Sequence, residues 1–174
     1  MTARAWFAML AAALALYAAQ DEKARPKRAE VAAVEEGFNE RVKKISLEDP
    51  MEVLSSAQGV YLQGYGAVFT AQVDLIVTPT LNPFRQTISP QEVERVRQRK
   101  LARLATVVAA MKETMAAAAR QLETVPAKEQ IVLAVSLFYS RWEDRNGLPG
   151  QIVMKAERQS LLSKAAGAIQ VEQY

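Results

Sequence analysis

The 174-residue sequence contains neither cysteine nor histidine. Their absence excludes disulfides, thiol redox chemistry, serine or cysteine nucleophiles assisted by histidine, and zinc sites built from histidine or cysteine ligands. The chemistry that remains uses carboxylate, lysine, tyrosine or serine side chains, or hard cations held by oxygen ligands. We expect no cofactor and no bound metal.

A large excess of charge of either sign is also missing. Lysine and arginine number 22 against 19 aspartates and glutamates, which gives a formal net charge of +3. So small an excess argues against a nucleic-acid partner. Half of the residues are hydrophobic, which favours a folded chain over a disordered one.

The N-terminus has the order of a secretory signal peptide. Arg4 is followed by an apolar run over residues 5–19 and then by the charged stretch 20–28. The run is shorter than the ~20 apolar residues of a membrane-spanning helix, so a signal cleaved near Ala19 is preferred to an anchor. We expect residues 20–28 to be a charged linker and the protein to be periplasmic or secreted, with membrane contact that is at most peripheral.

Helical spacing of apolar residues and capping patterns locate the helices. Ser89, Pro90 and Glu92 form a capping box that opens the longest one. Asp49 and Pro50 have the pattern of a helix start as well. The patterns predict helices from about 29 to 44, a short one from 49, a long one from 89 to Pro126, and a short one stopped by Gly167, with a flexible tail over 169–174.

Alternating and continuous apolar runs predict four strands, over 60–62, 67–77, 130–142 and 151–156. Gly64 and Gly66 lie between two strands rather than between a strand and a helix. They therefore indicate a hairpin turn and not a phosphate-binding loop. The run 130–142 is apolar on both faces, which is typical of a central strand or of a dimer contact.

Together these elements predict one α+β domain over residues 29–168. Two antiparallel β-hairpins are joined by the long amphipathic helix and form one four-stranded sheet, with helices packed on one face.

Three carboxylates are candidate catalytic residues. Glu143 and Asp144 follow Trp142, and aromatic side chains beside carboxylates are typical of sugar-binding and glycoside-hydrolysing sites. The preferred interpretation is structural: Trp142 closes the core at a hairpin end, and the two neighbouring acids point to opposite faces with their charges in solvent. Asp74 interrupts a strong strand pattern. We expect it to face solvent on the open side of the sheet, with a buried acid of raised pKa as the alternative.

Candidate binding residues lie in two other places. The long helix begins with a basic stretch of Arg95, Arg97, Arg99, Lys100 and Arg103. Arg95, Arg99 and Arg103 share one face, where they could meet an anionic surface, although a solvated face with local ion pairs is preferred for the whole stretch. Asn82 and Phe84 lie in a proline-containing loop, and loops on rigid scaffolds often carry binding residues.

No set of residues converges on a recognisable reaction. We therefore expect a non-catalytic binding or assembly protein of the cell envelope, with a second copy or an envelope protein as partner. The alternatives are a carboxylate-dependent hydrolase of a cell-wall polymer and a peripheral binder of anionic lipid.

Overall fold

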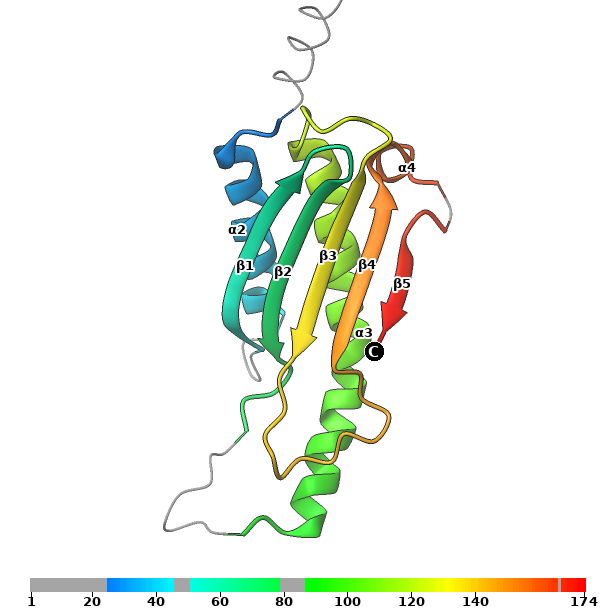
Figure 1. The fold of residues 1–174 in the computed structure, drawn as a ribbon. Helices are drawn as coiled ribbons and strands as arrows, with labels where there is room; N and C mark the ends of the chain where they lie inside the picture. The colour runs from blue at the N-terminus through cyan, green and yellow to red at the C-terminus, as the bar shows by residue number, and fades with distance from the viewer. Residues whose placement is uncertain (1–24, 46–50, 79–86, 166) are drawn as a thin grey trace, which may run out of the picture.

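The described part of the chain has an α+β fold in which three helices accompany an open five-stranded sheet (Figure 1). The computed structural model describes residues 25–45, 51–78, 87–165 and 167–174. The elements in chain order are α2 (Arg28–Lys44), β1 (Glu52–Leu62), β2 (Gly66–Asp74), α3 (Pro90–Gln121), β3 (Gln130–Leu137), β4 (Gln151–Glu157), α4 (Arg158–Leu162) and β5 (Gln170–Gln173).

The strands lie side by side in the order of the sequence, β1-β2-β3-β4-β5. The pairs β1/β2, β3/β4 and β4/β5 are antiparallel, whereas β2 and β3 are parallel. The two expected hairpins are present. They meet in parallel because α3 carries the chain from the end of β2 back to the start of β3, which is the connection that a parallel pair requires.

The fifth strand was not expected, because residues 169–174 were predicted to be a flexible tail. They form β5, in which Val171 pairs with Met154 of β4, and the chain ends with a further backbone bond from Tyr174 N to Gln151 O. The tail has no strong strand pattern of its own. The edge of β4 presents backbone N–H and C=O groups that no other strand pairs with, and such groups readily pair with an added strand.

Gly64 and Gly66 form the turn of the β1–β2 hairpin, as predicted. Both have positive φ angles, 79° and 135°. Gly66 also lies against β3: a Cβ atom at this position would lie 1.9 Å from the carbonyl oxygen of Gln130. A side chain is therefore excluded at Gly66 by close backbone approach, which is a structural requirement and not a binding function.

Strand β1 is longer than expected. The predicted helix start at Asp49 and Pro50 lies outside the described residues, but the chain from Glu52 onward is strand and not helix. Two irregularities of register interrupt the pairing of β1 with β2 between Val53 and Gln58. Bulges of this kind break the alternation of side chains, which explains why the sequence pattern predicted only residues 60–62.

The outer edge of β1 is covered by α2. Asn39 Oδ1 accepts a hydrogen bond from the Ala57 amide at 2.9 Å, and a carboxylate oxygen of Glu35 accepts one from the Gly59 amide at 2.7 Å. Arg28 holds both oxygens of the same carboxylate, and this pairing lowers the pKa of Glu35. These side chains occupy amides that would otherwise be open to another strand.

Helix α3 begins as predicted. Ser89 is the N-cap, its hydroxyl accepts from the Glu92 amide, and Pro90 is the first helical residue. Helices α2 and α3 both lie on one face of the sheet, as expected (Figure 1). One continuous core fills the space between the helices and the sheet, with Phe38, Phe69 and Met111 among its fully buried side chains.

Candidate functional site

The feature of the structure with the strongest chemistry is a buried lysine between two carboxylates. Lys100 projects from the first half of α3, beyond the end of the sheet, where Asp74 ends β2 and Glu143 lies in the connection from β3 to β4. The ammonium nitrogen Nζ of Lys100 lies 2.9 Å from Asp74 Oδ1 and 2.7 Å from Glu143 Oε2. We call these three residues the Lys100 cluster.

All three side chains of the Lys100 cluster are removed from water. Lys100 is fully buried, and the side chains of Asp74 and Glu143 are 7% and 1% exposed. Burial is the main cause that raises the pKa of Asp74, while the Lys100 ammonium opposes it. Moving ions out of water is costly, so one ammonium with two carboxylates persists only when further hydrogen bonds support it.

Those further bonds come from the backbone and from neighbouring side chains. The Phe138 carbonyl accepts from Lys100 Nζ at 3.1 Å. The second oxygen of Glu143 accepts from the Thr78 hydroxyl and from the Ser140 amide, each at 3.2 Å. The Ile76 amide donates to Asp74 at 3.2 Å. The cluster thus ties the end of β2 and the β3–β4 connection to α3.

An aromatic ring closes one side of the Lys100 cluster. The ammonium lies 4.9 Å from the ring centroid of Tyr139, and the Arg145 guanidinium lies 5.3 Å from the same centroid. The Tyr139 hydroxyl donates to the Pro149 carbonyl at 2.7 Å. Burial raises the pKa of Tyr139 to about 12, so this hydroxyl stays protonated at neutral pH.

The structure corrects two expectations about these acids. Asp74 was expected to face solvent, but it is buried on Lys100, so the alternative of a buried acid with raised pKa holds. Glu143 was expected on a hairpin end in solvent. The strand ends at Leu137, five residues before Trp142, and the irregular connection that follows turns Glu143 inward. Trp142 is only half-buried and lies outside the core.

The remaining candidates do not join the Lys100 cluster. Asp144 is exposed, and its Oδ2 lies 3.5 Å from Arg97 Nε. Arg95 pairs with Glu92 at 3.5 Å, and Arg103 donates to the Leu75 carbonyl at 2.9 Å. Arg99 also has an interaction partner. Asn82 and Phe84 lie outside the described residues.

Sequence reasoning missed Lys100, which it grouped with the solvated arginines of α3. The spacing of apolar residues in the helix could have identified it. Lys100 is four residues from both Val96 and Leu104, so it lies between them on the same apolar face of the helix. Val96 is buried, as is the lysine. A charged residue at a core position of a helical pattern indicates a buried ion pair.

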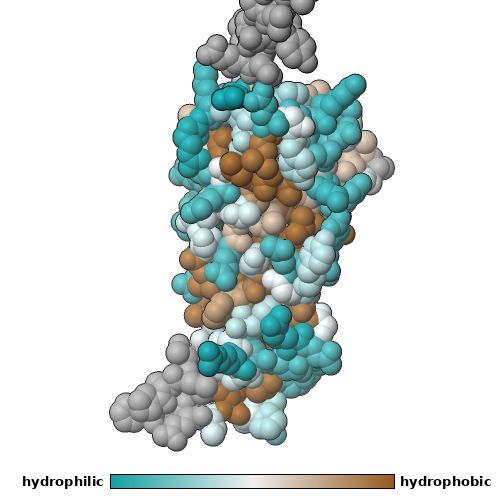
Figure 2. Space-filling view, viewed as in Figure 1, coloured by the Kyte–Doolittle hydropathy of each residue, from teal (hydrophilic) through white to brown (hydrophobic). Residues whose placement is uncertain are grey.

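The second feature is the face of the sheet opposite the helices, which we call the open face. Val60, Val68 and Val132 are paired across β1, β2 and β3 and form an apolar row on it. Val60 and Leu62 are 53% and 47% exposed. Figure 2 shows apolar side chains gathered over the upper part of this face.

Charge lies only at the margins of the described part of the open face. The side chains that β1, β2 and β3 contribute, as their pairing and burial identify them, are Ser55, Gln58, Val60, Leu62, Val68, Thr70, Gln72, Gln130, Val132, Ala134 and Ser136. None of them is charged, and the one exposed acid of these strands on this face, Glu52, lies at the far end of β1 where it pairs with Asp74. On β4 and β5 the face carries Lys155 and Glu172, which pair with each other at 2.7 Å. The neutral part therefore covers three neighbouring strands.

Comparisons with known proteins give no further guide to function. No protein-family model matches the chain, and neither a curated protein nor a solved structure is detectably similar to it. Within the described ranges, no helix is both long enough and apolar enough to span a bilayer. Nor does the described part of the chain gather three acidic side chains that could hold a metal ion.

Proposed function

We propose that this chain is an exported, non-catalytic assembly protein of the cell envelope that associates with a second copy through the open face of its sheet. One observation carries the proposal: from Ser55 to Leu62 of β1 and across β2 and β3, the open face is neutral, is covered by no described helix, and leaves Val60 and Leu62 about half exposed. Exposed apolar patches bordered by polar residues are typical of protein interfaces.

A second copy fits this surface better than a charged partner does. In a twofold dimer the same patch meets itself, so residues near the axis face their own equivalents. A charged residue there would face a like charge, whereas Val60 and Leu62, which are 53% and 47% exposed, would bury apolar area. The edge of β1 is a less suitable contact, because Asn39 and Glu35 already occupy two of its amides.

The expected contact residues differ from those that the sequence indicated. Leu133 and Val135 of the apolar strand are 2% and 0% exposed and pack toward the helices, so they are not available to a partner. Of the residues of the same strand on the open face, Val132 is itself only 7% exposed, and Ala134 and Ser136 are half-buried. The mutations that test assembly therefore belong on β1, where the apolar side chains are most exposed.

Solution mass tests the proposal directly. The chain from Gln20 onward keeps every core residue and can be measured by light scattering at several concentrations. We expect a dimer that Val60→Lys and Leu62→Lys convert to a monomer, because a lysine would face its own copy. Val77→Lys is the matched control, since Val77 is 55% exposed but follows the end of β2. A monomer at all concentrations would contradict self-association.

Export is supported by the charged start, the apolar run over 5–19 and the charged stretch that follows. N-terminal sequencing of the protein recovered from the cell envelope of a bacterial host tests this part separately. We expect a mature chain that begins near Gln20. Recovery of the intact chain from the cytosol would contradict export without bearing on the dimer.

The two alternatives have less support. A hydrolase would need carboxylates that reach a substrate, whereas Asp74 and Glu143 are buried and held by Lys100. A lipid-binding helix would need a cationic face, whereas Arg103 bonds the Leu75 carbonyl and Arg95 pairs with Glu92. We therefore propose neither function.

A further inference from the structure

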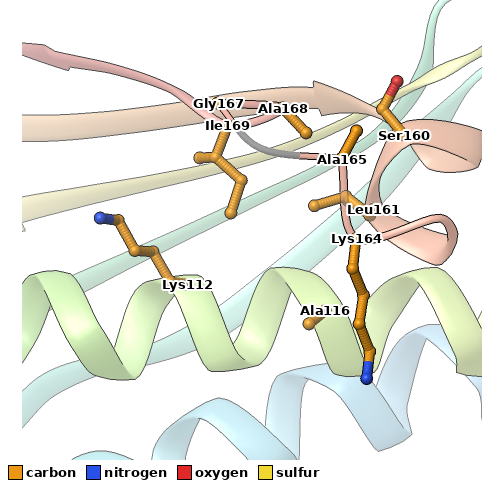
Figure 3. A pocket seen from close by; sticks show the side chains of 9 residues that line it. All are labelled: Lys112, Ala116, Ser160, Leu161, Lys164, Ala165, Gly167, Ala168 and Ile169. Atoms are coloured by element: carbon orange, nitrogen blue, oxygen red, sulfur yellow. The ribbon is translucent and has the colours of Figure 1, made fainter.

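A pocket lies between α3, α4 and the segment that leads to β5, and its lining includes no residue of the Lys100 cluster or of the open face (Figure 3). Its volume is about 330 Å³, within the range of small-molecule sites. The floor and walls are mostly apolar and are formed by Ala116, Leu161, Ala165, Ala168 and Ile169. An apolar ligand segment would exchange part of its contact with water for contact with these side chains.

Two lysines line the same pocket. Lys112 comes from α3, one helical turn from Ala116, and Lys164 follows the end of α4. Figure 3 shows their ammonium groups on different sides of the apolar side chains. Neither lysine forms an ion pair with a described residue, in contrast to Lys100 and Lys155. The pocket thus combines an apolar lining with two uncompensated positive charges.

The backbone at Lys164 is unusual. Lys164 has a φ of 52° and is the only residue other than glycine with positive φ in the described ranges. It occupies the position after the C-cap of α4, where the Ala165 amide bonds Ser160 O and the Lys164 amide bonds Leu161 O. Glycine is the preferred residue at this position of such a motif, because other residues are strained there.

We propose that this pocket binds a small anion with an apolar tail, of the fatty-carboxylate class. The tail would lie against Ala116, Leu161 and Ile169, and the positive potential of Lys112 and Lys164 would favour the carboxylate. This charge complementarity selects a carboxylate over a neutral amphiphile. The inference is independent of the proposed dimer, since none of these residues lies on the open face.

Decanoate is the probe, and decanol is its neutral counterpart of equal chain length. Calorimetric titration of the chain from Gln20 onward is expected to give saturable binding of decanoate and at least tenfold weaker binding of decanol. In amide NMR spectra, decanoate should shift the signals of residues 160–169 and 112–116. Equal affinity for decanol, or shifts centred on Val60 and Val68, would overturn the proposal.

Substitutions separate a binding role from a structural one. Lys112→Gln and Lys164→Gly should each weaken decanoate binding about two- to fivefold, since ion pairs open to water are individually modest. Lys164→Gly should not lower the midpoint of thermal unfolding, because glycine relieves the strain. Ala116→Leu fills the floor and should abolish binding. Lys128→Gln, an exposed lysine outside the pocket, is the matched control.

Unchanged affinity in both lysine variants would overturn the electrostatic part of the proposal. Absence of saturable decanoate binding to the unmodified chain would overturn it altogether.

Discussion

Replacing Lys100 with methionine is the sharpest test of how this structure is held together. Methionine matches the length of much of the lysine side chain but leaves Asp74 and Glu143 buried without their ammonium. Removing one partner of a buried ion pair costs about 3–5 kcal/mol. Since small domains are typically stable by only ~5–15 kcal/mol, we expect a large loss of the free energy of unfolding at pH 7.

The loss should depend on pH in a defined direction. Burial raises the pKa of Asp74 even with Lys100 present, and the ammonium is the main opposing influence. Without it the pKa of Asp74 rises further. An acid with a raised pKa in the folded state stabilises that state below its unfolded pKa and loses this contribution as pH rises through the folded value. The difference in the free energy of unfolding between Lys100→Met and the unmodified chain should therefore shrink as pH falls from 7 toward 4.

Urea unfolding followed by circular dichroism at several pH values measures both effects. Lys112→Met is the control, because this exposed lysine on the same helix has no ion pair with a described residue. Adding Asp74→Asn and Glu143→Gln to Lys100→Met removes the unpaired charges and should recover most of the stability. A loss below about 1 kcal/mol at pH 7, or a deficit that does not change with pH, would refute the reasoning.

Two further predictions concern the first hairpin and its edge. Gly66→Ala should prevent folding or lower the free energy of unfolding by more than about 3 kcal/mol, since its Cβ would overlap Gln130 O. Gly64→Ala has open space around it and should cost only about 1 kcal/mol. Thermal unfolding of both variants separates these outcomes, and equal losses would contradict the close approach of Gly66 to Gln130. Asn39→Ala leaves the Ala57 amide without its acceptor and should cost about 1 kcal/mol while raising aggregation. Urea unfolding and light scattering measure the two effects, and an unchanged aggregation rate would contradict the role of α2 in covering the edge.

Local sequence patterns determined much of this fold. The capping box at Ser89 set the start of α3, and the paired glycines set the first hairpin. Alternation and apolar runs located β2 and β4 to within three residues and the start of β3, although β3 ends at Leu137 and not at Trp142. These features depend on backbone geometry and on periodic burial, which are properties of neighbouring residues and are therefore visible in the sequence.

The tertiary structure decided the features that depend on distant partners. β5 exists because β4 offers an unpaired edge, and the full length of β1 depends on bulges and on contacts from α2. The parallel pairing of β2 and β3 follows from the path of α3.

The charged residues show the same division. The sequence identified Asp74 and Glu143 as candidates but could not bring them together, because they are distant in the chain and meet only on Lys100. It placed Lys100 in solvent by residue type, although its spacing from Val96 and Leu104 marked a core position. Whether a lysine is solvated or buried depends on the acids that surround it in space, and only the folded chain supplies them.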